Sequence, residues 1–159
     1  MVRDADTALQ FGSKMQLSYN VENTQRAIGT RLSSHIVRKF GMTGLRENHI
    51  SVRLRGTAGQ SLGAFATQGL RLEVIGDAND YVGKGLSGGT IIVRPSAAAA
   101  FVAHENTIIG NTVLYGATSG KLFAAGQAGE RLCVRNSGAT AVVELSLIHI
   151  SEPTRQVLI

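Results

Sequence analysis

The chain has 159 residues, enough for one domain, and a composition of 43% hydrophobic and 17% charged residues, which excludes an intrinsically disordered protein. Its 19 glycines and only 2 prolines indicate many tight turns and exclude both a collagen repeat and a low-complexity linker. The net charge of +5 arises within residues 1–55, where no basic run exceeds two residues and no aromatic side chains alternate with the basic ones. A nucleic-acid-binding module is therefore only an alternative to a solvated or subunit-facing basic surface.

The first predicted element is a strand at residues 15–19, which are apolar at alternate positions. A short helix is expected to follow, because Leu32, Ile36 and Phe40 repeat at a spacing of four residues. Thr30 is the predicted N-cap of this helix, and Gly41 is the predicted residue at its C-terminal end.

From residue 50 onward the pattern is typical of short strands separated by turn residues. Apolar runs are centred near residues 52, 72, 92, 113 and 133, and a second series runs from 122 to 142. This step of about 20 residues predicts an all-β fold, a parallel β-helix with about 20 residues per coil and a short N-terminal helical segment. A doubly wound α/β fold has no room for its helices, and an antiparallel sandwich imposes no constant step.

Two glycine-containing motifs resemble ligand sites but lack the required context. The segment Gly83-Lys-Gly85-Leu-Ser-Gly88 matches the dinucleotide fingerprint, which needs a helix after it, but a β-branched run follows. We interpret its glycines as corner residues with positive φ. Residues 76–80 place two carboxylates and an amide in one turn, without the twelve-residue loop of a calcium-binding EF-hand.

The histidines and the cysteine do not form a recognisable catalytic or metal site. His104-Glu105 begins like a zinc-protease helix, but Ile108 stands where the second histidine is needed, and His35 and His49 have no partner at ligand spacing. The single cysteine excludes an internal disulfide, and its apolar neighbours predict a buried thiol. Four asparagines near turns are candidates to bridge adjacent coils: Asn79, Asn106, Asn111 and Asn136. We therefore assign no catalytic, cofactor-binding or metal-binding residue.

Asp4 and Asp6 interrupt the apolar stretch that a signal peptide needs, and no apolar run approaches the roughly 20 residues of a membrane span. A chain that is not exported and carries one thiol is expected to be cytoplasmic.

Six ordered blocks of sequence, at residues 23–33, 56–61, 76–85, 105–112, 114–118 and 122–138, carry a resemblance to a known family. They resemble the C-terminal GXGXG domain of the glutamate synthase large (alpha) subunit, over about residues 21–144, with residues 1–20 as a lead-in. The resemblance implies a right-handed β-helix and a truncated part of a longer chain. The alternative is a stand-alone GXGXG protein resembling a subunit of formylmethanofuran dehydrogenase.

The resemblance also implies a parent enzyme, an oxidoreductase of glutamate biosynthesis and nitrogen assimilation. That enzyme converts glutamine, 2-oxoglutarate and reductant into two glutamates, with an N-terminal cysteine nucleophile, FMN and a [3Fe–4S] cluster. None of these sites corresponds to a position in this chain. The implied role is structural, with the amidotransferase and FMN domains of the parent chain as partners and the small subunit as a further candidate. No nucleic-acid or membrane partner is implied.

The sequence departs from the family pattern after Glu144. Residues 145–155 resemble the translation of a sequencing-library adapter, so residues 145–159 are expected to lie outside the domain. We expect residues 152–159 to lack regular structure, and His149 and Glu152 to have no functional role.

Overall fold

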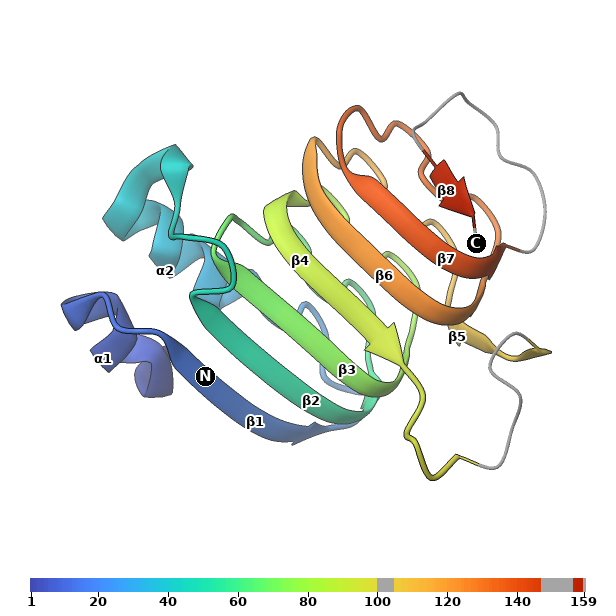
Figure 1. Ribbon diagram of the computed structural model, residues 1–159, viewed down its shortest axis with the longest axis horizontal. Helices are drawn as coiled ribbons and strands as arrows, with labels where there is room; N and C mark the ends of the chain where they lie inside the picture. The colour runs from blue at the N-terminus through green and yellow to red at the C-terminus, as the bar shows by residue number, and fades with distance from the viewer. Residues whose placement is uncertain (100–104, 147–155, 159) are drawn as a thin grey trace.

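The computed structural model describes residues 1–99, 105–146 and 156–158. Two helices, α1 (Val2–Phe11) and α2 (Thr30–Phe40), and the short 3-10 helix η1 (Gly41–Thr43) lie at one end of a parallel sheet (Figure 1). The strands are β1 (Met15–Val21), β2 (Ile50–Ala58), β3 (Leu70–Ala78), β4 (Ser87–Arg94), β5 (Thr107–Ile109), β6 (Ser119–Ala128), β7 (Thr140–Ser146) and β8 (Gln156–Leu158).

The strands pair in the order β1-β2-β3-β4-β6-β7-β8, and β5 lies beside β3 and β6. The register reflects the sequence period, because Val52 pairs with Leu72, Leu72 with Ile91, and Leu122 with Ala141. Between β4 and β6 the step is longer, with Ile91 opposite Leu122.

The predicted β-helix is wrong, because the strands in the described part of the chain form one parallel sheet with no further sheet to close a solenoid. The apolar runs at residues 113–115 and 132–134 were expected to be strands. However, Leu114 and Cys133 have φ values of 57° and 63°, which lie far from the extended conformation. Both runs belong to turns behind the sheet. The fold also contains more helix than the all-β prediction allowed, since α1 was not expected.

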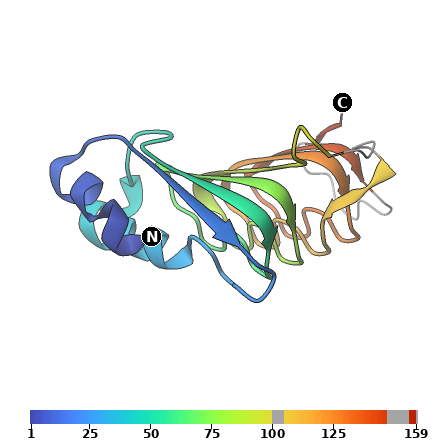
Figure 2. The same cartoon turned by 90° about the horizontal axis from the view of Figure 1, so that it is seen from below.

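Four return segments, residues 59–69, 79–86, 110–118 and 129–139, connect successive strands and stack against one another on one side of the sheet (Figure 2). In each segment, three alternate residues have φ between 56° and 67°: Ser61, Gly63 and Phe65; Tyr81, Gly83 and Gly85; Thr112, Leu114 and Gly116; Arg131, Cys133 and Arg135. The positive φ predicted for Gly83, Gly85 and Gly88 is confirmed.

The core lies between the sheet and the return segments. Alternate residues of β2 and β3 are buried on this side, and they pack with buried aliphatic side chains of the return segments, including Leu62, Val82 and Val113. Helix α2 adds Leu32 and Ile36 to the same cluster. This two-layer packing explains the strict alternation of the strands, whose other face is partly exposed.

The predicted helix is present, and its predicted end at Gly41 is confirmed. Its N-cap is Gly29, with φ of 93°, so the prediction of Thr30 as the cap is wrong. The Thr30 hydroxyl instead donates a hydrogen bond to the Ala64 carbonyl at 2.8 Å, which ties the start of α2 to the first return segment.

The tail differs from its prediction. Strand β7 continues to Ser146, beyond the expected boundary at Glu144, and Gln156–Leu158 pairs with it as β8. The expectation that residues 152–159 lack regular structure is therefore wrong for residues 156–158. His149 and Glu152 lie outside the described residues. The division into residues 1–20, 21–144 and 145–159 stays a prediction.

A close backbone approach that requires glycine lies at Gly76, which pairs with Gly56 across β2 and β3. A Cβ at Gly76 would overlap the Gly56 carbonyl oxygen, and its φ of 146° is unfavourable for other residues. We expect Gly76→Ala to reduce the free energy of unfolding by about 3 kcal/mol or more, because strain and overpacking each cost about 1–3 kcal/mol. Urea denaturation measures the loss.

The matched control is Gly116→Ala, because Gly116 has φ of 64° but, apart from its two chain neighbours, no atom of the described residues lies within 4 Å of the position that a Cβ would occupy there. This variant should lose only the backbone strain, about 1–2 kcal/mol. Equal losses in the two variants would contradict the close-approach explanation.

Ending the chain after Ser146 would remove β8, which contributes three register pairs to β7. We expect the free energy of unfolding to change by no more than about 1 kcal/mol, because the buried core of the sheet is left intact. Ending the chain after Ala139 should be far more damaging, since Ala141 and Val143 are buried in β7. Similar losses for the two truncations, measured by urea denaturation, would show that β8 is an integral part of the fold.

Candidate functional site: the charged outer face of the sheet

The outer face of the sheet, opposite the return segments, carries polar side chains over β2–β4 and apolar ones over β4–β7. In one row across the strands, Arg53, Glu73, Ile92, Phe123 and Val142 are neighbours in register. Each of these side chains is at least partly exposed, whereas the residues between them along the strands are buried. The face therefore offers a charged half and an apolar half.

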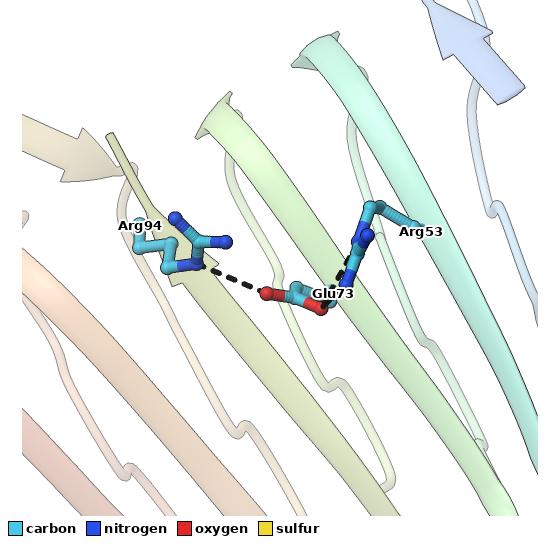
Figure 3. A network of polar contacts seen from close by, with 3 residues as sticks. All are labelled: Arg53, Glu73 and Arg94. Atoms are coloured by element: carbon cyan, nitrogen blue, oxygen red, sulfur yellow. Dashed lines mark hydrogen bonds and ion pairs between the residues drawn. The ribbon is translucent and has the colours of Figure 1, made fainter. Parts of the chain in front are cut away.

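A three-residue ion-pair network joins β2, β3 and β4 on the charged half (Figure 3). The Arg94 Nε donates to Glu73 Oε1 at 3.0 Å, and the Arg53 Nε and Nη2 lie 3.4 Å from Glu73 Oε2. Partial burial raises the pKa of Glu73, but the hydrogen bond from Arg94 and the two positive charges outweigh it, so the pKa lies below its usual value. Glu73 is therefore ionised at neutral pH and its charge is balanced locally.

An open cavity of about 320 Å³ lies on the same face, beside the network. We call it the outer-face cavity; it is lined by Lys14, Met15, Gln16, Asn48, His49, Ser51, Arg53, Arg71 and Glu73. His49 is only 7% exposed, and neither of its ring nitrogens has a hydrogen-bond partner among the residues that the structure describes. The sequence has no signal that selects His49, because this residue lies in a bend directly before β2 and belongs to no periodic pattern.

A second cavity, of about 700 Å³, lies where α1, β1 and α2 meet. Inside it the Tyr19 hydroxyl donates to Asp4 Oδ2, which also accepts a hydrogen bond from the Met1 amino group at 2.6 Å. Burial, together with the Asp4 carboxylate, raises the pKa of Tyr19 to about 12. The phenol stays protonated at neutral pH, so this arrangement holds α1 against β1 and provides no nucleophile.

The glycine motif and the acidic turn have structural roles. The segment Gly83–Gly88 leads into β4, a strand, so the helix that a dinucleotide fingerprint requires is missing there. In the acidic turn, Asp80 Oδ1 accepts a hydrogen bond from the Asn111 backbone N–H at 2.7 Å. Within the described ranges, no three His, Cys, Asp or Glu side chains gather in a way that could hold a metal ion.

One of the predicted asparagine bridges is confirmed. Asn111 Oδ1 accepts a hydrogen bond from the Glu130 N–H at 2.8 Å and so connects two return segments. Asn136 instead caps its own turn, because its Oδ1 accepts from the N–H groups of Gly138 and Ala139. The Asn79 side chain forms no such bridge to any residue that the structure describes.

Cys133 and His35 do not line the outer-face cavity. Cys133 is buried as predicted, and burial raises the pKa of its thiol even though a contact with Asn136 lowers it. His35 is exposed on α2, with Nδ1 3.0 Å from the Arg31 carbonyl oxygen. His104 lies outside the described residues. None of these groups faces another to form a nucleophile–base pair in the part of the chain that is described.

No helix among the described residues is long and apolar enough to span a membrane.

Several curated proteins are similar to this chain over most of its length. The glutamate synthase [NADPH] large chain of Azospirillum brasilense is 72% identical over 144 residues, which are 91% of this chain and 10% of that protein. The glutamate synthase [NADH] of Saccharomyces cerevisiae is 49% identical over 91% of this chain and 7% of its own length. Ferredoxin-dependent glutamate synthase 2 of Synechocystis is 47% identical over 94% of this chain and 10% of its own length. This chain thus spans about a tenth of the length of these relatives.

A family model described as the GXGXG motif matches residues 1–153. Glycine at alternate positions occurs here at Gly83 and Gly85, where both residues take the left-handed backbone of a return segment. The match covers nearly the whole chain, including the return segments and every strand of the sheet except β8. The chain belongs to the GXGXG motif family.

Proposed function

We propose that this chain is the GXGXG portion of a glutamate synthase large chain, and that it serves as structural support rather than as a catalytic unit. The observation that carries the proposal is the 72% identity to the Azospirillum brasilense large chain over 91% of the residues. The parent enzyme, in a cytoplasmic setting, would convert glutamine, 2-oxoglutarate and reductant into two molecules of glutamate.

The residues of this chain do not fit the cofactors of such an enzyme. A [3Fe–4S] cluster is held by several thiolates, whereas this chain has a single cysteine, and Cys133 is buried in the core. FMN and the cluster would therefore be bound by other domains of the parent chain. Relatives named for NADPH, NADH and ferredoxin all match this chain, which supports the view that the GXGXG portion does not select the electron donor.

The outer face supplies surfaces by which this portion would support its neighbours, the amidotransferase and FMN domains. A groove of about 390 Å³ runs over β4, β6 and β7 and includes Ile92, Phe123 and Val142. Phe123 is 38% exposed, which is unusual for a large aromatic side chain in the middle of a sheet. Burial of this apolar half against a neighbouring domain would hold the two at a fixed distance.

The purified 159-residue chain is expected to show no glutaminase or glutamate synthase turnover and to bind no flavin. The reason is that the cavities described above contain no nucleophile–base pair and no cofactor motif. Activity assays and absorbance in the flavin bands check this expectation, with circular dichroism to verify that the sample is folded. Flavin absorbance that copurifies with the folded chain would contradict it.

A chimera tests the proposed role directly. The matching segment of the Azospirillum brasilense large chain is replaced by residues 1–144 of this chain, and glutamate synthase activity, flavin content and melting temperature are measured. We expect activity within about twofold of the parent, because a structural support with a preserved core leaves the distant chemistry unchanged.

The control chimera carries Gly76→Ala, which should lower the melting temperature and reduce activity in proportion to the folded fraction. A chimera that assembles, keeps its flavin and melts like the parent but loses turnover would contradict a purely structural role.

A further inference from the structure

The sheet begins with a strand whose outer edge has no partner among the described residues. Strand β1 pairs with β2 and is the first strand in the sheet order, so its other edge is open (Figure 1). At the start of this parallel ladder the Met15 N–H donates to the His49 carbonyl at 3.0 Å, and successive residues of a strand direct their backbone groups to alternate edges. The N–H and C=O groups of Gln16, Ser18 and Asn20 therefore point away from β2.

The core is also incomplete along this edge. The inward-facing side chains of β1 include Met15, Leu17 and Tyr19, and all three are partly exposed although they pack against the core. The β2 residues in register with them are at most 1% exposed, because β2 has a strand on each side. An added strand beside β1 would therefore extend both the hydrogen-bond ladder and the apolar core.

The surface next to this edge is positively charged. The cavity of about 700 Å³ between α1, β1 and α2, which we call the α1–α2 cavity, includes Tyr19 and Asn20 near the end of β1. Its lining also contains three exposed arginines, Arg3, Arg26 and Arg31. None of these arginines forms an ion pair with a residue that the structure describes. Their charges are therefore available to a carboxylate that reaches the cavity.

The one acidic residue in the lining of the α1–α2 cavity is already engaged. Asp4 Oδ2 accepts hydrogen bonds from the Met1 amino group, at 2.6 Å, and from the Tyr19 hydroxyl. A second copy of this chain would present the same arginines, so pairing between two β1 edges would bring like charges together. Charge complementarity favours instead an acidic segment as the occupant of the edge.

We propose that the open edge of β1 binds an extended acidic polypeptide segment as an added parallel strand. Backbone hydrogen bonds to Gln16, Ser18 and Asn20 would hold the segment, and its apolar side chains at alternate positions would cover Leu17 and Tyr19. Its carboxylates would lie where the segment passes the end of β1 and reaches the α1–α2 cavity. The parallel orientation matches the pairing of β1 with β2 and of β2 with β3. This binding mode requires only the geometry of the edge and holds whether or not the chain is part of a glutamate synthase.

The test uses the 159-residue chain and the capped peptide Val-Ser-Leu-Ser-Val-Glu-Glu, whose carboxylates follow its apolar part as the parallel orientation requires. Calorimetric titration measures binding, and NMR measures the exchange of backbone amide hydrogens with solvent. We expect saturable binding, and exchange at Gln16, Ser18 and Asn20 should slow about tenfold when roughly nine-tenths of the chain is bound. The control peptide Val-Ser-Leu-Ser-Val-Lys-Lys should bind about tenfold more weakly or less, at the same ionic strength.

Two variants separate the contributions of the backbone and of the charges. Ser18→Pro removes a donor from the open edge without removing a bond to β2, a change that edge strands tolerate, and it should weaken peptide binding about tenfold. Arg31→Gln removes one charge from the cavity and should weaken binding about threefold. Arg38→Gln is the matched control, because Arg38 is exposed on the same helix but does not line the cavity, and it should bind like the unmodified chain.

Slower exchange at the three amides, together with weaker binding to Arg31→Gln than to Arg38→Gln, supports the proposal even if Ser18→Pro does not fold. The proposal is overturned if the peptide does not bind, if it binds without protecting these amides, or if the lysine peptide binds equally well. Sedimentation of the free chain gives a further check. Dimers in which the same amides are already protected would show that a second copy occupies the edge, and would also overturn the proposal.

Discussion

Hydrogen bonding between successive return segments is the constraint on which the rest of the fold depends. Parallel strands usually need a crossover of about a dozen residues or more, commonly a helix, yet only residues 79–86 connect β3 to β4. Because alternate residues are left-handed, the Gly83 N–H bonds back to the Leu62 carbonyl while the Gly85 N–H bonds forward to the Tyr115 carbonyl, both at 2.8 Å. The short crossovers thus satisfy their own backbone groups and keep the strands in register.

The elements predictable from sequence were those in which side-chain period and backbone conformation agree. Residues 50–54 and 70–74 alternate strictly and form β2 and β3, and Gly41 ends α2 as expected. The apolar runs at 113–115 and 132–134 were wrongly predicted to be strands, because apolar side chains indicate burial but do not determine the backbone φ angle. Leu114 is fully buried, yet its backbone is left-handed, at a cost of about 1–2 kcal/mol that its burial and its hydrogen bond to Val82 offset.

The same distinction applies to the outer face. The sequence period of about 20 residues places Arg53 beside Glu73, whereas Arg94 pairs with Ile75 and reaches Glu73 only diagonally, because Glu73 itself pairs with Ile92. The environment of His49 could not be found in this way. His49 lies in the bend that precedes β2, where its backbone N–H donates to the Arg46 carbonyl at 3.1 Å, and no periodic pattern reports the path of that loop.

The stepwise register also has a consequence for the order in which the chain acquires structure during synthesis. Most strands pair with the strand made immediately before them, as β3 does with β2, so only short loops must close and the sheet can grow from its N-terminal end. This growth is interrupted at β4, because Ile91 pairs with Leu122 of β6, which is synthesised about 30 residues later. Strand β5 likewise pairs with an earlier strand that does not directly precede it, since Ile109 lies opposite Ala78 of β3. Until β6 leaves the ribosome, β4 is an uncovered strand edge, and this interval is when a nascent chain is most open to pairing with another molecule.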